Sequence, residues 1–362
     1  MTTRVHLVGT GLIGGSLGLA LTRSGYAVTL EDQSPTAAAL AGDLGAGVAG
    51  RPSQSPDLVI VATPPDVTAG LVVDALRRWP AAVVTDVASV KGAVLAAVAL
   101  AGADTSRYVG CHPMAGRERS GIMAARPDIF EGRAWVVAPG PDSRPDAVDL
   151  VADVGRALGG AVSVLAPAEH DAAVAAVSHV PQIAASLVAA RLAGLPENAV
   201  GLAGPGIRDV TRIAASDPQL WTQILAANAG AVRAVLDSLV ADLDRVRTAL
   251  ADLEHAQDGA APGARAAIAG VIAEGNTGYA RLPGKHGGAH TAYATVGVVV
   301  PDEPGSLGRL LNDVGDAGVN LEDLFLEHGL DMPFGLAEIL VVPDAAAPLQ
   351  EALLARGWRI HD

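Results

Sequence analysis

The stretch Gly9-Thr10-Gly11-Leu12-Ile13-Gly14 decides the fold of this chain. It follows the short apolar run Val5–Val8, which predicts a buried strand, and it opens the helical pattern of Leu12–Arg23. In such a unit the first glycine makes the tight turn, the second lets the backbone approach a pyrophosphate, and the third lets the helix pack on the strand. The phosphates would lie at the helix N-terminus, where free N–H groups favour anions. The sequence therefore predicts a dinucleotide site made by these six residues.

A carboxylate stands where the adenosine ribose of that dinucleotide would lie. The expected strand Ala27–Leu30 is followed by Asp32, which can accept hydrogen bonds from the ribose hydroxyls and would repel a 2′-phosphate. Thr63 and Pro64 end a later expected strand, at the carboxyl edge where a cofactor would lie. Asp32 therefore favours NAD over NADP as the cofactor.

Strands and helices alternate over the first 167 residues. This alternation predicts an α/β fold with a doubly wound, Rossmann-type parallel sheet. The expected strands are Val5–Val8, Ala27–Leu30, Leu58–Ala62, Val83–Asp86, Tyr108–Cys111 and Ala134–Val137.

Three further segments follow the dinucleotide-binding domain of residues 1–167. Residues 168–258 are rich in Ala, Val and Leu and predict an all-α substrate and dimerisation domain. Residues 259–290 are predicted to be a linker with one short helix around 264–273. Residues 291–362 predict a small α+β domain, which we expect to be a βαββαβ-like module. Its expected strands are Ala294–Val300, Asn320–Leu326 and Ala337–Val342, and its expected helices are Ser306–Ala317 and Ala347–Arg356.

Composition excludes several classes of function. The 362 residues are 50% hydrophobic and 18% charged, which is a globular composition. With 25 basic and 39 acidic residues, the net charge of −14 argues against nucleic-acid or anionic-membrane partners. The single cysteine excludes a disulfide framework and a cysteine-rich metal site, and the pair His286 and His290 lacks a third ligand, so we expect no metal. We see neither an apolar run of membrane-spanning length nor a signal peptide, and therefore expect a cytoplasmic protein.

Two polar segments leave the carboxyl ends of expected strands, where ligands bind in this architecture. One contains Ser89 and the other contains His112. His112 precedes a proline and is held extended, and beside a dinucleotide it could transfer a proton. The adjacent Cys111 points the opposite way and is expected to be a small buried hydrophobe. Lys91 could be catalytic, but a lysine at a helix start is more often a phosphate or surface contact.

The helical region carries a second set of candidates. His170 and His179 are nine residues apart, which places them on opposite faces of one ideal helix. They can line one site only if the helix breaks or two elements meet, whereas Ser178, His179 and Gln182 can share a face. Arg212 lies in an otherwise apolar stretch and suits bidentate capture of a carboxylate, although a surface salt bridge is the alternative.

Together these segments resemble the prephenate/arogenate dehydrogenase family of tyrosine biosynthesis over nearly the whole chain. The matching segments are Gly9–Gly14, Asp86–Gly92, His112–Gly116, Glu169–Asp171, Ser178–Pro181, Gly206–Ala214 and Ser216–Trp221. The tail, with Asp302–Leu307 and Gly318–Leu321, resembles an ACT domain, which some bacterial members carry.

The resemblance implies roles for individual residues. His112 resembles the histidine that accepts the proton of the substrate C4 hydroxyl, Ser89 the serine that orients this hydroxyl and the nicotinamide, and Arg212 the arginine that pairs with a substrate carboxylate. Other residues fall at pocket positions (His170, Ser178, His179, Trp221) or at a charged gate (Glu118, Arg208, Asp209). Gln182 departs from the family, because some prephenate-specific members have a histidine there, so the choice between a keto and an amino side chain stays open.

The resemblance implies an NAD-dependent prephenate dehydrogenase, which forms 4-hydroxyphenylpyruvate by oxidative decarboxylation. The nearest alternative is an arogenate dehydrogenase, which forms tyrosine. A β-hydroxyacid dehydrogenase would need a lysine in the helical region, and residues 168–253 contain none. A more distant alternative is an amino-acid sensor without catalysis. We expect a homodimer with a small-molecule substrate, and tyrosine as an effector at the tail.

Overall fold

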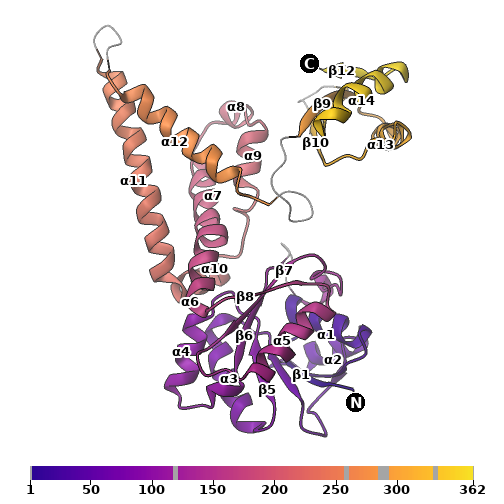
Figure 1. Ribbon diagram of the computed structural model, residues 1–362, viewed down its shortest axis with the longest axis vertical. Helices are drawn as coiled ribbons and strands as arrows, with labels where there is room; N and C mark the ends of the chain where they lie inside the picture. Colours follow the sequence, from indigo (N-terminus) through magenta and orange to yellow (C-terminus); the bar gives the residue numbers. More distant parts are fainter. Residues whose placement is uncertain (1, 117–120, 257–260, 284–292, 329–332, 362) are drawn as a thin grey trace. The chain divides into compact units, whose positions relative to one another are not determined.

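The computed structural model describes residues 2–116, 121–256, 261–283, 293–328 and 333–361 (Figure 1). By contacts the chain divides into two compact units, Met1–Leu239 and Val240–Asp362. The predicted Rossmann-type region and most of the helical region thus lie in one unit, which contains all the candidate site residues described below.

The first unit holds eight strands and most of the helices. Its strands are β1 (Arg4–Val8), β2 (Ala27–Glu31), β3 (Val48–Ala49), β4 (Leu58–Val61), β5 (Val83–Asp86), β6 (Val109–Pro113), β7 (Ala134–Pro139) and β8 (Ala161–Val164). Its α-helices are α1 (Leu12–Arg23), α2 (Pro35–Asp43), α3 (Pro65–Arg78), α4 (Gly92–Leu100), α5 (Pro145–Ala157), α6 (Pro167–Val174), α7 (Val180–Ala190), α8 (Glu197–Val200), α9 (Pro205–Thr211) and α10 (Pro218–Ala227). Helix α11 (Ala229–Glu254) begins in this unit, a π-helix (Ala175–His179) joins α6 to α7, and short 3₁₀ turns span Thr105–Arg107, Ile122–Ala124 and Leu192–Gly194.

The sheet is Rossmann-type, as the sequence predicts, but it is not parallel throughout. Strands β3-β2-β1-β4-β5 form a parallel sheet, and a parallel bridge between Val84 and Tyr108 joins β5 to β6. Strand β7 pairs antiparallel with β6 and parallel with β8, which corrects the prediction of parallel strands. A parallel neighbour needs a long crossover, usually a helix. The described part of the β6–β7 connection contains no α-helix, only the 3₁₀ turn Ile122–Ala124 and further turns over residues 127–132, and the chain returns antiparallel.

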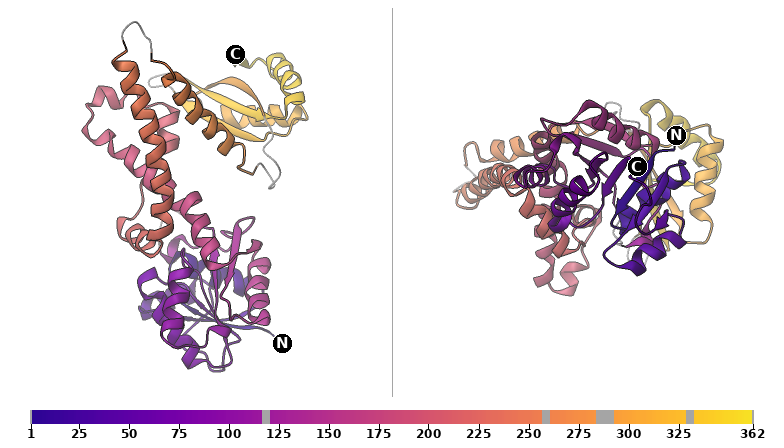
Figure 2. Two further views of the ribbon diagram at one scale, coloured as in Figure 1. Left: turned by 60° about the vertical axis from the view of Figure 1, so that its left-hand side comes forward. Right: turned by 90° about the horizontal axis from the view of Figure 1, so that it is seen from below.

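Both faces of the sheet are covered by helices (Figure 1 and Figure 2). Strand β4 shows why, because all four of its residues are buried and successive side chains point to opposite faces. Leu58 and Ile60 belong to the apolar cluster that includes α1 and α5, whereas Val59 and Val61 belong to the cluster that includes α3 and α4. Since strands β1 to β5 run parallel, their carboxyl ends lie together at one edge of this covered sheet.

A charged cluster is buried beneath that edge. Lys91 is only 1% exposed, and its ammonium group donates to Asp86 and, over 2.7 Å, to the carbonyl of Cys111. The Tyr108 hydroxyl donates to the other oxygen of Asp86 over 2.6 Å. Lys91 is therefore an internal ion-pair partner and not the phosphate or surface contact that its position suggested. Cys111 is buried as predicted, and burial raises the pKa of its thiol to about 12.

One helical stretch corrects the expectation that no apolar run is long enough to cross a membrane. Pro167–Gly194 is long and apolar enough to cross a membrane by length and composition alone, and 33% of its apolar 18-residue window is buried. Core helices of soluble proteins pass the same test. This stretch contains the buried, hydrogen-bonded side chains of His170 and His179, which belong to the candidate site.

The second unit contains the end of α11, a further helix and an α+β domain. Helix α12 (Ala264–Tyr279) is longer than predicted, and an ion pair of 2.7 Å joins Glu274 to Arg245 of α11, so much of the predicted linker is helical. The α+β domain comprises β9 (Ala294–Pro301), α13 (Ser306–Asp316), β10 (Asp323–His328), β11 (Phe334–Val341), α14 (Pro343–Ala355) and β12 (Arg359–His361).

The α+β domain has the predicted βαββαβ order, and its antiparallel strands lie in the order β10-β11-β9-β12. The second strand begins at Asp323 and not at Asn320 as predicted. Asn320 lies in the irregular segment after the turn at Gly318 (φ +71°), where its amide donates to Glu322. An apolar cluster that includes Val298, Leu310 and Ile339 holds both helices against the sheet.

The buried pair of Lys91 and Asp86 generates a prediction about stability. Lys91→Met leaves a buried carboxylate without its cation, so we expect the free energy of unfolding in urea to fall by about 3–5 kcal/mol. The double variant Asp86→Asn/Lys91→Met removes both charges and should lose less than Lys91→Met alone. The exposed Arg233→Met is the control, with a change within about 0.5 kcal/mol. Equal losses in the single and double variants would contradict this account.

Candidate functional site

The glycine loop between β1 and α1 is shaped by close contacts on one side and is open on the other. Gly9 has φ +97°, and a Cβ there would lie 2.3 Å from the carbonyl oxygen of Ala62. A Cβ on Gly14 would lie 2.0 Å from the carbonyl oxygen of Gly9. Gly11, the N-cap of α1, is exposed and would meet nothing within 4 Å. The loop therefore needs glycine for its own packing at two positions, and at the third it offers open space at a helix N-terminus.

Asp32 is hydrogen-bonded to this loop. One oxygen of its carboxylate accepts from the backbone N–H of Thr10 over 2.7 Å and from the Thr10 hydroxyl over 2.8 Å. The other oxygen accepts from the backbone N–H of Ser34 over 2.9 Å. A carboxylate has about four acceptor sites, so Asp32 keeps capacity for one more donor while Thr10 holds its position.

The loop after β4 lies against the glycine loop. The γ-methyl of Thr63 lies 2.9 Å from the position of a Cβ on Gly9. The hydroxyls of Thr63 and Thr68 are 3.1 Å apart, and the Thr68 hydroxyl also donates to the carbonyl of Pro64 over 2.9 Å. The predicted cofactor residues of β1, β2 and β4 thus gather at one edge of the sheet, while Leu12 and Ile13 begin α1.

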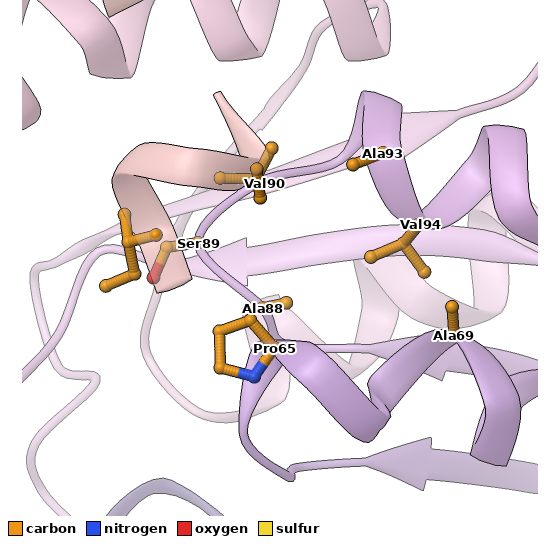
Figure 3. Close-up of a pocket in the computed structure, with 9 residues that line it drawn as sticks. Pro65, Ala69, Ala88, Ser89, Val90, Ala93 and Val94 are labelled. Atoms are coloured by element: carbon orange, nitrogen blue, oxygen red, sulfur yellow. The ribbon is translucent and has the colours of Figure 1, made fainter. Parts of the chain in front are cut away.

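Ser89 lies on the next loop of the same edge, between β5 and α4. It is half-buried and lines a pocket of about 80 Å³ with Pro65, Ala88 and Val90 (Figure 3). Ile224 of α10 lines this pocket too, so the pocket lies where the helical region meets the sheet edge.

His112 lies on β6, and hydrogen bonds through the side chains of His170 and Asp171 connect it to the helical region. The distance between His112 Nδ1 and His170 Nε2 is 2.9 Å, and that between His170 Nδ1 and Asp171 Oδ1 is 2.8 Å. His112 is half-buried and His170 is fully buried. His170, predicted to be a pocket residue, therefore lies behind His112 and binds it.

Asp171 connects the same group to the loop that carries Ser89. Its Oδ1 accepts from the backbone N–H of Lys91 and its Oδ2 from that of Gly92, both over 2.8 Å, at the N-terminus of α4. Burial alone would raise the pKa of Asp171, but the hydrogen bonds from His170 and from these two N–H groups outweigh it, so the pKa lies below its usual value. Sequence reasoning missed this residue as a site residue, although it lies next to His170.

The π-helix places His179 near His170. Its wider turn separates α6 from α7, and this is the break that the spacing of the two histidines required. Asn228 bridges the two segments, because its amide donates to the carbonyl of Asp171 over 2.8 Å and lies 3.2 Å from His179 Nδ1. The ring of Trp221 meets His179 edge-on, with centroids 6.1 Å apart. No sequence motif pointed to Asn228.

The surroundings of His112 favour its neutral form. Burial lowers the pKa of His112 well below its usual value, and the positive charge of Lys91, together with any positive charge on His170 or His179, acts in the same direction. A neutral imidazole keeps one ring nitrogen as a proton acceptor. Since Nδ1 faces His170, Nε2 is the nitrogen left for a ligand, and no partner for it is recorded among the residues that the structure describes.

The remaining predicted residues lie farther along the helical region. Gln182 is buried and its amide donates to the Ser216 hydroxyl over 2.7 Å, so it holds the chain segment before α10. Ser178 is half-buried in the π-helix. Arg208 and Asp209 lie on α9 and Arg212 follows it, and all three are exposed.

Some expectations lie outside the described residues. Glu118, predicted for the charged gate, and the pair His286 and His290 fall there. Within the described ranges, no group of three or more His, Cys, Asp and Glu side chains could hold a metal ion.

Comparison with known proteins gives a consistent result. Residues 17–164 match the family described as prephenate dehydrogenase, nucleotide-binding domain, and residues 166–259 match prephenate dehydrogenase, dimerization domain. The chain is 36% identical to the probable prephenate dehydrogenase NovF of Streptomyces niveus, over 97% of this chain and 98% of that protein.

Two solved structures are similar over about three quarters of the chain. Prephenate dehydrogenase from Aquifex aeolicus, in complex with hydroxyphenyl propionate and NAD+, has a TM-score of 0.65 and 27% identity, and covers 77% of this chain and 96% of its own. Arogenate dehydrogenase from Synechocystis has a TM-score of 0.64 and 26% identity, over 76% of this chain and 99% of its own.

The open space at Gly11 generates a prediction about the nucleotide. Gly11→Ala should fold with nearly unchanged stability, because its Cβ meets no protein atom, but should bind NAD+ at least about 10-fold more weakly, because the Cβ occupies the approach of the pyrophosphate. Isothermal titration calorimetry measures the affinity. Gly70→Ala on α3 is the matched control, since its Cβ also meets nothing, and its NAD+ affinity should not change. Equal affinities in all three proteins would remove Gly11 from the nucleotide site.

Proposed function

Because this chain belongs to the prephenate dehydrogenase family, we propose that it catalyses the NAD-dependent oxidative decarboxylation of prephenate to 4-hydroxyphenylpyruvate. The observation that carries the proposal is the neutral, half-buried His112 at the carboxyl edge of a dinucleotide-binding sheet, with Ser89 on a loop of the same edge. An acceptor for a hydroxyl proton beside a hydride-accepting cofactor is what an alcohol oxidation needs.

NAD fits the loops at this edge. The free N–H groups at the N-terminus of α1 and the open face of Gly11 suit a pyrophosphate. Asp32 keeps one acceptor site for a ribose hydroxyl and would repel a 2′-phosphate, which favours NAD over NADP. When bound, NAD supplies the acceptor for a hydride. The chain itself has to orient the substrate and move a proton.

His112 is proposed as the proton acceptor, through Nε2. Its lowered pKa keeps it unprotonated at neutral pH, so it can accept the proton of the C4 hydroxyl as hydride leaves that carbon. Ser89 is proposed to orient the same hydroxyl. Departure of CO₂ makes the ring aromatic, so the protein needs mainly to position and polarise the substrate.

Substrate carboxylates require a cation, and Arg212 is the proposed one. It is exposed after α9, where a guanidinium can make two parallel hydrogen bonds to a carboxylate. His179, Ser178 and Trp221 are proposed pocket residues, and Glu118, Arg208 and Asp209 a charged gate. His170 and Gln182 are committed to internal partners and are proposed to shape the pocket from behind.

Arogenate is the second candidate substrate, supported by the likeness to the Synechocystis arogenate dehydrogenase. The two substrates differ in a keto or an amino side chain. Gln182 places a neutral amide where some prephenate-specific relatives have histidine. This residue therefore does not decide between the keto side chain of prephenate and the amino side chain of arogenate.

A homodimer in the cytoplasm is part of the proposal. The chain has the dimerisation domain of its family, and α7 with the preceding π-helix leaves Val177, Leu187 and Val188 exposed. Burying these apolar side chains against a second copy would remove them from water.

The direct test is NADH formation with prephenate and arogenate side by side. We expect prephenate to be the better substrate, with His112→Asn lowering kcat about 10²–10⁴-fold while NAD+ affinity is kept. Arg233→Met, exposed on α11, is the control and should keep wild-type rates. Turnover of arogenate alone would transfer the assignment to that substrate, and near-normal turnover by His112→Asn would remove this residue from the mechanism.

We further propose that residues 291–362 form an ACT-like domain that binds tyrosine. The βαββαβ order and the N-terminus of α13 after Gly305, whose free N–H groups can meet a carboxylate, support this. The alternative is that this domain only stabilises a dimer. A ligand alters activity only through different affinities for two states of the protein.

Truncation near residue 288 tests the tail. We expect the truncated enzyme to keep its activity with prephenate and to lose inhibition by tyrosine. Tyrosine titrations of NADH formation by both proteins, with prephenate at its KM, measure this. The same response in both would place any inhibition at the active site and reject the sensing role.

A further inference from the structure

Two side chains behind the proposed proton acceptor form, together with it, a series of hydrogen bonds with a defined direction. Asp171, His170 and His112 are joined in series by contacts of 2.8 Å and 2.9 Å. His170 has no exposed surface, so no ligand reaches it directly. The ring centroids are 5.2 Å apart and the facing nitrogens only 2.9 Å apart, so each ring presents a nitrogen and not its face to the other.

The first link has only one possible direction. The backbone N–H groups of Lys91 and Gly92 can only donate, and both point at the Asp171 carboxylate. Asp171 is therefore an ionised acceptor, in agreement with its lowered pKa. Since Oδ1 also faces His170 Nδ1, that nitrogen must carry the proton, because two acceptors would otherwise face each other.

The second link follows from the first. We take the His170 ring to be neutral, because a second proton would place a cation on a side chain that has no exposed surface. In a neutral imidazole that is protonated on Nδ1, Nε2 holds a lone pair. His170 Nε2 is thus an acceptor, and His112 Nδ1 has to donate to it. A neutral His112 with its proton on Nδ1 keeps the lone pair of Nε2 free.

We propose that His170 and Asp171 are positioning residues that set the tautomer of His112, so that its Nε2 is the proton acceptor of the reaction. Its catalytic meaning rests on the proposed function, but the tautomer itself is a property of the protein without substrate. Because Asp171 also holds the first N–H groups of α4, the same carboxylate fixes the loop of Ser89 relative to His112.

The groups around His112 are consistent with this arrangement. Lys91 is a cation and His170 and His179 are titratable groups near His112, and a positive charge on any of the three opposes a proton on His112. Lys91 is hydrogen-bonded to Asp86, and His179 lies beside Asn228. Among the described residues, the hydrogen-bond partner of His112 Nδ1 is His170.

Two substitutions of His170 separate positioning from simple packing. A glutamine places its amide near the position of Nε2, where its oxygen can accept from His112. An asparagine reaches only the position of Nδ1, toward Asp171, and leaves His112 Nδ1 without an acceptor. We expect His170→Asn to lower kcat with prephenate at least about 100-fold, with KM changed less than about threefold. The kcat of His170→Gln should be at least about tenfold higher than that of His170→Asn.

The matched control is His6→Asn. His6 is also buried and has two side-chain partners, Thr29 and Glu31, on β2. It should lose stability like the His170 variants and keep wild-type kcat. Equal kcat values for His170→Asn and His170→Gln would show that His170 contributes packing alone, which overturns the proposal.

Nitrogen-15 NMR of the imidazole rings tests the tautomer without substrate. At neutral pH we expect His112 in the wild type to be protonated on Nδ1 with an unprotonated Nε2, its signals being assigned with His112→Asn. In His170→Asn this preference should be lost. A proton on His112 Nε2 in the wild type would overturn the proposal, whether or not the enzyme turns over prephenate, whereas absence of turnover with the expected tautomer would count against the proposed function alone.

Discussion

The site depends on one carboxylate, that of Asp171. The carboxylate accepts hydrogen bonds from two backbone N–H groups at the start of α4 and from the ring of His170. The backbone carbonyl of the same residue accepts from the amide of Asn228. Gly92 has no side chain because a Cβ would lie 2.8 Å from this carboxylate. The helical region is thereby attached to the carboxyl edge of the sheet at the point where Ser89 and His112 leave it.

The second constraint is the π-helix between α6 and α7. A regular α-helix would place His170 and His179 on opposite sides, whereas the wider turn lets one face the sheet edge and the other reach Asn228 and Trp221. The buried Lys91–Asp86 pair adds a fixed positive charge behind β6. Because of that charge and of burial, His112 stays neutral without any acidic partner of its own.

Local patterns allowed much of this to be predicted. The glycine loop after β1, the position of Asp32 after β2 and the strand–helix alternation depend on neighbours in sequence, and the structure has all three where the sequence predicts them. The binding roles of the loop and of Asp32 are proposals. The partners of Asp171 could not be predicted, since Lys91 lies 80 residues away and the contact exists only after folding. The antiparallel β7 and the length of α12 were missed for a related reason, because no local signal specifies the direction of a returning strand or the end of an Ala- and Gly-rich helix.

The most direct test of the account is the pH dependence of kcat/KM for prephenate with the wild-type enzyme. The proposed base, His112, accepts a proton only when it is neutral. The value of kcat/KM is therefore maximal above the pKa of His112 and falls as the pH decreases through that pKa. Because the pKa of His112 lies below its usual value of about 6.5, the account predicts a plateau that continues below pH 6.5 and an acid limb, at lower pH, that disappears in His112→Asn. An acid limb above pH 6.5, or one that persists in His112→Asn, would contradict it.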